Sequence, residues 1–266
     1  EDMLATGQNI PDVNISEDKY YNTPAGKFKT DAMKQFHNLY VKKHLIYGVA
    51  KQGDTLIDLA CGKAGDLPKW IASKLRFVFG VDISKDNLEN RLDGACARYL
   101  NARKINKQVP YALFVNGNSA YNIQDGSAML SEKAKQITAA VFGNGPKNLG
   151  PGVARQYGKG ADGFNVTSCQ FALHYFFENP DTLRGFMKNI AQCTKHNGYF
   201  IGTAYDGKLV FNELKKTKTG DSVKIVENEK KIWEIIKGYN ADTFEDDSSS
   251  IGYRIDVFQE SINQLI

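Results

Sequence analysis

The stretch LIDLACGKAGDLPKW (Leu56–Trp70) decides the fold of this 266-residue chain. It reads as a buried strand, a tight turn and the start of a helix, and Gly62 and Gly65 let the backbone turn sharply and approach a ligand. The G-x-G-x-x-G signature of dinucleotide-binding turns is absent. Asp58 and Asp66 flank the turn instead, and such carboxylates would repel a pyrophosphate at the helix N-terminus. The turn therefore favours a cationic ligand, and S-adenosylmethionine, with its ammonium and sulfonium groups, is one.

Strands and helices alternate on both sides of this turn. Apolar runs read as buried strands at Thr55–Ala60, Phe77–Val81, Tyr111–Val115, Phe164–Ser168 and Tyr199–Ala204. Helices are predicted over Thr30–Gly48, Asp66–Lys74, Ser84–Lys104 and Asp181–Lys195. This alternation indicates a doubly wound, mainly parallel sheet with helices on both faces. We expect an α/β, Rossmann-like fold with insertions. The acidic turn, together with Asp82 and Asn118 (described below), makes the class I S-adenosylmethionine-dependent methyltransferase type the expected form of it.

The domain organisation predicted from these elements has two parts. Residues 1–30 are polar and turn-rich, so we expect an N-terminal arm on the surface, and residues 31–266 form the methyltransferase domain. The chain starts without methionine, and we interpret it as a piece of a longer polypeptide.

Two insertions interrupt the alternation, at about 120–163 and 206–250. The first combines a helix-like piece near Leu130–Val141 with a glycine-rich stretch, which is too long for an ordinary connection. We expect it to be a mobile functional loop or partly disordered. In the second, two alternating runs around a charged turn predict a hairpin, Val223–Glu227 with Lys231–Ile236, and a late strand follows over Ile251–Phe258.

Further polar residues follow the second and third strands. Asp82 lies 20 residues after Gly62, where an acidic residue takes the ribose hydroxyls of an adenosine-containing cofactor. Asn118, after the third strand, can hydrogen-bond the adenine amino group. A generic βαβ unit with incidental acids would explain the turn alone, whereas the combination favours a methyltransferase.

The composition excludes some classes of protein. A net charge of +4 and a pI near 8.7 permit a nucleic-acid partner without requiring one. The 4 cysteines are widely spaced and fit neither a disulfide framework nor a zinc site, so we expect a reducing compartment and no metal centre. No apolar run approaches the length of a membrane span, and no signal peptide is visible.

The segment SCQFALHYFFE (Ser168–Glu178) follows the fourth predicted strand. At the carboxyl end of a strand in an open α/β sheet it would lie where ligands bind. Its four aromatic rings and few hydrogen-bonding groups suit a planar, polar and even cationic ligand. Alternatively, the rings belong to the core and His174 is a satisfied buried histidine.

Taken together, the motifs resemble those of the mRNA cap guanine-N7 methyltransferases. The matching stretches are the two quoted above, with FHNLYVKKHLI (Phe36–Ile46), GVDIS (Gly80–Ser84) and YFIGTAYDG (Tyr199–Gly207). The first of these, TAYDGK and the ending GYRIDVFQESI look closest to the capping enzymes of large cytoplasmic DNA viruses. The resemblance implies an enzyme that methylates N7 of the guanine cap of 5′-capped mRNA, fused to or associated with triphosphatase and guanylyltransferase domains and not attached to a membrane. It implies the host cytoplasm or the virion if the source is viral, and the nucleus if it is cellular.

The resemblance also implies roles for individual residues. Cofactor-binding roles fall on Lys42, Asp58, Ala60, Gly62, Asp66, Asp82, Asn118, Ser119, Gln170 and Tyr175. Cap-binding roles fall on Asn38, Lys63, Phe171, His174, Tyr175 and Tyr205. Lys42 and Asp58 would hold the amino acid end of the cofactor, and Asn118 with Ser119 its adenine. Gln170 and Tyr175 would lie between the cofactor and the guanine, and Lys63 is placed for the cap phosphates.

Several positions depart from the family pattern. A leucine, Leu39, follows Asn38 where the family has a second asparagine, and Asn118 replaces an aspartate. Ala60 and Ala64 stand where glycines are common, which a methyl group tolerates if φ is negative. The carboxyl-terminal glutamate that hydrogen-bonds the guanine edge has no match.

The expected chemistry needs no general base. Guanine N7 already carries an in-plane lone pair, so proximity and in-line alignment suffice. His174 is therefore expected to position the guanine, not to remove a proton. Two alternatives stay open: a methyltransferase that acts on another RNA or a small molecule, and a catalytically silent methyltransferase-fold scaffold.

Overall fold

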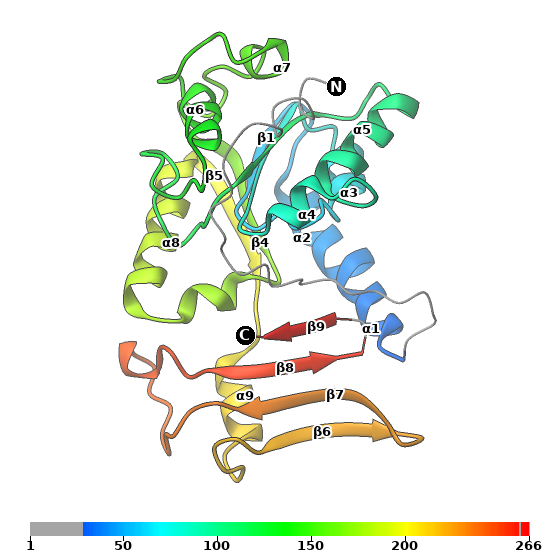
Figure 1. Cartoon of the computed structure of the whole chain (residues 1–266), viewed down its shortest axis with the longest axis vertical. Coiled ribbons are helices and arrows are strands. Elements are labelled where there is room, and N and C mark those ends of the chain that lie inside the picture. The colour runs from blue at the N-terminus through cyan, green and yellow to red at the C-terminus, as the bar shows by residue number, and fades with distance from the viewer. Residues whose placement is uncertain (1–28, 261, 266) are drawn as a thin grey trace.

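Five parallel strands form the central sheet of the protein (Figure 1). They are β1 (Thr55–Asp58), β2 (Phe77–Asp82), β3 (Tyr111–Asn116), β4 (Phe164–Gln170) and β5 (Thr194–Thr203). Their spatial order is β3-β2-β1-β4-β5, so the order reverses between β1 and β4, which is where open α/β sheets bind ligands. A computed structural model describes residues 29–260 and 262–265, and the predicted arm lies almost wholly outside them. The predicted α/β fold is confirmed.

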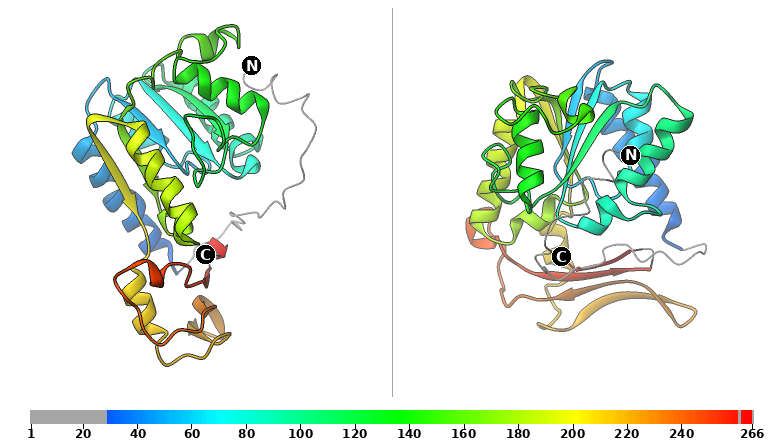
Figure 2. Two further views of the ribbon diagram at one scale, coloured as in Figure 1. Left: turned by 90° about the vertical axis from the view of Figure 1, so that its left-hand side faces the viewer. Right: turned by 45° about the horizontal axis from the view of Figure 1, so that its top comes forward.

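Helices cover both faces of this sheet, as Figure 2 shows. One face packs against α2 (Lys42–Val49), α3 (Leu67–Ala72), α4 (Lys85–Glu89) and α5 (Ala95–Ile105). The other packs against α6 (Glu132–Val141), α7 (Pro151–Ala154) and α8 (Pro180–Cys193). Successive strand residues point to opposite faces, so Val78 joins the first layer and Phe79 the second. Both faces are therefore apolar, which is why the strands read as continuous apolar runs.

The helix predicted over Ser84–Lys104 is wrong as a single element, because α4 and α5 are separate. The chain turns at Asn90–Gly94, where the N–H of Gly94 donates to the carbonyl of Asn90. A side chain at Gly94 would place its Cβ 2.7 Å from the Asn90 backbone. Only glycine fits this close approach, so the helical pattern is interrupted.

The segment 120–163 is structured, contrary to our expectation of a loop or disorder. It contains α6 and α7, and Val141, Phe142 and Val153 belong to the core that covers one face of the sheet. The helix-like piece near Leu130–Val141 is confirmed as α6. We expected a loop because the segment is rich in glycine, but its few apolar side chains are enough to pack it against the sheet.

The first helix of the described region is continuous but not uniform. It consists of α1 (Asp31–Gln35), a π-helical turn η2 (Phe36–Val41) and α2. The apolar spacing from Thr30 to Gly48 therefore predicted the helix correctly but gave no sign of the π turn. None of the helices in the described part of the chain is long and apolar enough to cross a bilayer.

A second, antiparallel sheet lies beyond β5. It contains β6 (Ser222–Glu227), β7 (Lys230–Lys237), β8 (Ile255–Gln259) and β9 (Ile262–Leu265), with α9 (Gly207–Glu213) packed against it. The predicted hairpin is confirmed as β6 and β7, and its turn residues Asn228 and Glu229 both have positive φ. The predicted late strand joins this sheet and not the parallel one. Figure 1 shows β9 as the strand nearest the parallel sheet.

Candidate active site

The polar residues that follow the parallel strands gather at one edge of the central sheet. Asp58 ends β1, Asp82 ends β2, Gln170 ends β4 and Thr203 ends β5. Parallel strands present their carboxyl ends at the same edge, so segments far apart in the sequence meet there. Asp58 pairs in register with Ser168 of β4, across the reversal in strand order.

Asp82 organises the turn that follows β1. Its Oδ2 accepts the N–H of Gly62 at 2.7 Å, and its Oδ1 accepts the N–H of Ser84 at 3.0 Å and the amide of Asn87 at 3.2 Å. Burial raises the pKa of Asp82, while these hydrogen bonds act to lower it. The carboxylate is thus both the predicted ribose ligand and a structural anchor of the turn.

The turn also contains a strained alanine. Ala64 has a φ of 54°, in the left-handed region, so the condition of a negative φ fails at this position. A non-glycine residue there costs roughly 1–2 kcal/mol. Ala64 is 2% exposed and its N–H donates to the carbonyl of Cys61, so packing and a hydrogen bond hold it.

Asp58 is a buried carboxylate without a cation at salt-bridge distance among the described residues. It accepts the N–H of Ala60 at 3.2 Å. Burial and the nearby charge of Asp66 raise the pKa of Asp58 to about 7. A positively charged ligand would relieve both effects.

Asp66 is engaged by two lysines instead of facing an open space. Its Oδ1 lies 2.8 Å from the Nζ of Lys69, and its Oδ2 lies 3.4 Å from the Nζ of Lys42. The same Lys42 ammonium lies 5.5 Å from the centre of the Phe171 ring. Lys42 therefore connects the turn after β1 with the segment after β4.

The two residues predicted to bind the adenine, Asn118 and Ser119, differ in which of their hydrogen-bonding groups are already used within the protein. The Ser119 hydroxyl donates to the carbonyl of Leu59 at 2.6 Å, and its carbonyl accepts the Asn189 amide at 2.8 Å. Ser119 therefore ties the loop to the core. Asn118 accepts the N–H of Ala120 with its Oδ1 at 2.9 Å. Its side-chain nitrogen has no acceptor among the described residues, so its two N–H groups can donate to a ligand.

The aromatic segment leaves β4 through a strained residue. Phe171 has a φ of 57°, and its N–H donates to the Thr203 carbonyl at 3.1 Å and the Thr203 hydroxyl at 2.7 Å. The short helix η3 (Leu173–Phe177) follows. Phe176 stacks on Phe186 at 4.0 Å, so the core alternative holds for this one ring.

His174 is not the satisfied buried histidine of the alternative interpretation. Both ring nitrogens are buried, and neither has a hydrogen-bond partner among residues 29–260 and 262–265. Its ring lies 4.5 Å from that of Tyr175 and 5.1 Å from that of Tyr205. Burial lowers the pKa of His174 to about 4, so the imidazole is neutral and offers one donor and one acceptor.

Lys63 and Asn38 are the remaining predicted cap-binding residues. Lys63 is 2.8 Å from both carboxylate oxygens of Asp93, so it is already paired. Asn38 lies on the π-helical turn. Its neighbour His37 was not among the site residues predicted from the sequence. The His37 ring is 4.7 Å from that of Phe171, a contact that α-helical spacing would not suggest.

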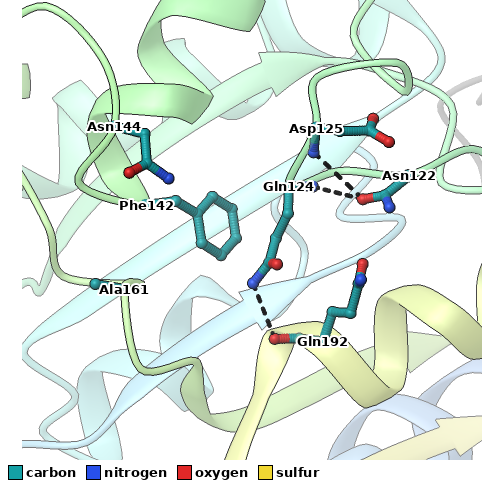
Figure 3. Close-up of a pocket in the computed structure, with 7 residues that line it drawn as sticks. All are labelled: Asn122, Gln124, Asp125, Phe142, Asn144, Ala161 and Gln192. Carbon is teal, nitrogen blue, oxygen red and sulfur yellow. Dashed lines mark hydrogen bonds between the residues drawn. The ribbon is translucent and has the colours of Figure 1, made fainter.

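A separate cavity of about 320 Å³ lies away from these residues (Figure 3). Its lining consists of Asn122, Gln124, Asp125, Phe142, Asn144, Ala161 and Gln192. The Gln124 amide donates to the Gln192 carbonyl at 3.0 Å. This cavity contains none of the predicted site residues, and no nucleophile with an adjacent base. The strand ends, not this cavity, hold the candidate active site.

Comparison with known proteins gives consistent matches. A model of the mRNA (guanine-N(7))-methyltransferase domain matches residues 26–239. A probable mRNA-capping enzyme of Acanthamoeba polyphaga mimivirus is 29% identical over 232 residues, 87% of this chain and 18% of the relative. The mRNA cap guanine-N(7) methyltransferase 1 of Oryza sativa subsp. japonica is 29% identical over 185 residues, 70% of this chain and 42% of the relative. The mRNA cap guanine-N(7) methyltransferase of Saccharomyces cerevisiae is 29% identical over 184 residues, 69% of this chain and 34% of the relative. The chain thus spans less than half the length of each of these relatives.

Proposed function

This chain belongs to the mRNA (guanine-N(7))-methyltransferase family, and from that premise we propose that it methylates N7 of the guanine cap of mRNA with S-adenosylmethionine as donor. The names of its relatives support this activity and this substrate. The site adds support of its own, because it offers a place for a cation and a place for a flat polar ring at one sheet edge.

One observation carries the proposal. Within the part of the chain that the structure describes, the buried imidazole of His174 has two unpartnered nitrogens and lies among aromatic rings. It lies at the edge where Asp58 has no cation at salt-bridge distance among those same residues. Buried polar groups are normally satisfied, so an unpartnered pair of nitrogens calls for a ligand. Guanine presents both donors and acceptors on a flat ring, which suits a neutral imidazole between tyrosines.

The residues of the turn fit S-adenosylmethionine. Asp58 would take its ammonium, since a cation stabilises a buried carboxylate. Asp82 would take its ribose, Lys42 its carboxylate and Asn118 its adenine, while Ala60, Gly62 and Asp66 shape the turn around it. When bound, the cofactor supplies a methyl group on a sulfonium, with a neutral leaving group.

On the acceptor side, the residues position the guanine and stabilise charge. The N7 lone pair is free, so no residue has to remove a proton, and a His174 with a pKa of about 4 is a poor base. Positive charge moves onto the purine during transfer. The faces of Tyr175 and Tyr205 would stabilise it by about 0.5–2 kcal/mol each. Gln170, Phe171 and Asn38 would complete the pocket.

The decisive experiment separates methyl transfer from cofactor binding. We expect His174→Ala and Tyr175→Ala to lose methyl transfer to GpppG-ended RNA while calorimetry still detects S-adenosylmethionine binding. His196→Ala and Tyr199→Ala, exposed residues of β5, are matched controls that should keep full activity. Parental rates in both site variants would refute the proposal, and a preference for uncapped RNA or small acceptors would redirect it to another methyltransferase.

We also propose that the domain works beside triphosphatase and guanylyltransferase domains. The mimivirus relative is named a probable mRNA-capping enzyme and is several times longer than its matched part. A viral enzyme of this kind would act in the host cytoplasm or the virion, and a cellular one in the nucleus. Immunofluorescence of the tagged native protein distinguishes these compartments.

A further inference from the structure

The helix that carries Asn38 and Lys42 changes its winding at one place, the π-helical turn η2. In a π turn the backbone hydrogen bonds join residues five apart, whereas an α-helix places such residues about 140° apart around its axis. Single π turns within α-helices are rare and frequently mark functional sites. A π turn therefore brings side chains five residues apart to the same face of the helix.

Two residues five positions apart, His37 and Lys42, contact the same aromatic ring. The ring of His37 lies 4.7 Å from that of Phe171, at an interplanar angle of 37°. The Lys42 ammonium lies 5.5 Å from the centre of the same ring. In a regular α-helix these two side chains would point in different directions, so the π turn is what brings both to Phe171.

Phe171 is a rigid partner for them. Its positive φ is unfavourable for a residue with a side chain, and its N–H is held by the carbonyl and the hydroxyl of Thr203. Such strain persists only where the surroundings over-determine it, and it concentrates at active sites and ligand clamps. The backbone that carries the ring is thus fixed at the carboxyl end of β4.

The His37 imidazole has no hydrogen-bond partner within the part of the chain that the structure describes. Burial and the charge of Lys42 lower the pKa of His37, so the ring is neutral at neutral pH and offers one donor and one acceptor. Lys42 lies between Phe171 and Asp66 of the turn after β1. His37 thus contacts Phe171 and neighbours Asn38 in the π turn, and the proposed function assigns both of these residues to the cap.

We infer that His37 is a substrate-positioning residue whose imidazole, held against Phe171 by the π turn, hydrogen-bonds the polar edge of the cap guanosine. This inference rests on the proposed function. His37 and His174 then hold the same nucleoside from two elements, the first helix and the segment after β4. Neither the family pattern nor the sequence motifs assign this role to His37.

Three variants separate stacking from hydrogen bonding. His37→Ala removes both, His37→Phe keeps an aromatic ring against Phe171, and His37→Gln restores a donor and an acceptor. We expect His37→Ala and His37→Phe to raise the KM for GpppG-ended RNA by roughly three- to tenfold, the value of one hydrogen bond, with kcat and the Kd for S-adenosylmethionine unchanged. His37→Gln should recover most of the loss. His44→Ala, an exposed histidine of the same helix, is the control and should match the parent.

The outcomes are distinct. A parental KM in His37→Phe would overturn the inference, because the hydrogen bond would then be unused. Equal losses toward RNA and cofactor with a lower melting temperature would also overturn it, since the role would then be structural. A parent that binds S-adenosylmethionine but methylates no GpppG-ended RNA would refute the proposed function and this inference together, whereas an active parent with an unaffected His37→Ala refutes the inference alone.

Discussion

The carboxylate of Asp82 accepts the backbone N–H of Gly62 at 2.7 Å, which joins the tip of β2 to the turn after β1. The two residues are 20 positions apart in the sequence. Gly62 itself has a φ of 51°, a conformation that glycine adopts without strain. The side chain predicted to bind the ribose therefore also determines the shape of the turn that would hold the rest of the cofactor.

We predict that Asp82→Ala weakens cofactor binding and destabilises the fold together. The partly buried N–H groups of Gly62 and Ser84 would lose their acceptor, at a cost of about 1 kcal/mol for each group. Calorimetry with S-adenosylmethionine and urea unfolding measure the two effects. Asp86→Ala is the control, because among the described residues that α4 carboxylate accepts a side-chain amide from Asn90, the C-cap of the helix, and holds nothing of the turn after β1. Unchanged affinity in Asp82→Ala would contradict the predicted ribose contact.

Binding of S-adenosylmethionine should depend on pH through Asp58. Its pKa is raised from 3.8 to about 7, and a bound ammonium would lower it again. Affinity should therefore fall as the pH drops below about 7, with uptake of cofactor coupled to proton release. The same raised pKa means that the contribution of Asp58 to the free energy of unfolding decreases as the pH rises from about 4 to about 7.

Calorimetry in two buffers of different ionisation enthalpy, between about pH 6 and about pH 8, measures the released proton. Asp58→Asn removes the titrating group, so its weaker binding should show no such release. A parental protein with the same Kd and no proton release across this range would contradict the prediction.

The ion pair between Lys63 and Asp93 should compete with the cap phosphates. Lys63 holds both oxygens of Asp93 at 2.8 Å, and the lysine side chain is 12% exposed against 48% for the aspartate. We expect Asp93→Asn to lower the KM for GpppG-ended RNA and Lys63→Ala to raise it, each by a few-fold at low salt. In the double variant, Asp93→Asn should have no further effect. An equal effect of Asp93→Asn with and without Lys63 would show that the lysine does not reach the phosphates.

The antiparallel sheet should depend on the aromatic core beneath it. Phe211 of α9 is 5% exposed and lies 5.8 Å from the ring of Tyr239 and 5.5 Å from that of Phe244. Phe211→Ala should lower the free energy of unfolding by about 3–5 kcal/mol. Leu209→Ala, on the same helix but 64% exposed, should change it by less than about 0.5 kcal/mol. Similar losses in both variants would place the core elsewhere.

Local patterns were enough to predict the five strands of the central sheet and most of the helices that cover it. Buried strands such as β1 and β2 appear as apolar runs, so Asp82 could be placed at the tip of β2. The first apolar run predicts a strand that continues to Ala60, whereas β1 ends at Asp58, so the structure and not the run puts this carboxylate at a strand tip. The turn after β1 and the hairpin of β6 and β7 have residue types that their backbone geometry requires. The apolar spacing over Ser84–Lys104 wrongly predicted one continuous helix. The chain turns at Gly94, where a side chain would clash with the backbone of Asn90, and the spacing of apolar residues does not reveal this close approach.

The tertiary structure alone decided which side chains meet. Neighbouring residues were sufficient to indicate an α/β chain with an acidic turn and an aromatic segment, because hydrophobic periodicity and turn composition are local properties of the sequence. The sequence could not show that His37 packs on Phe171, that Lys63 is held by Asp93, or that His174 lacks a partner among the residues that the structure describes. These contacts depend on the strand order β3-β2-β1-β4-β5 and on one π turn. They join residues that are far apart in the sequence, so they form only when the elements pack against one another.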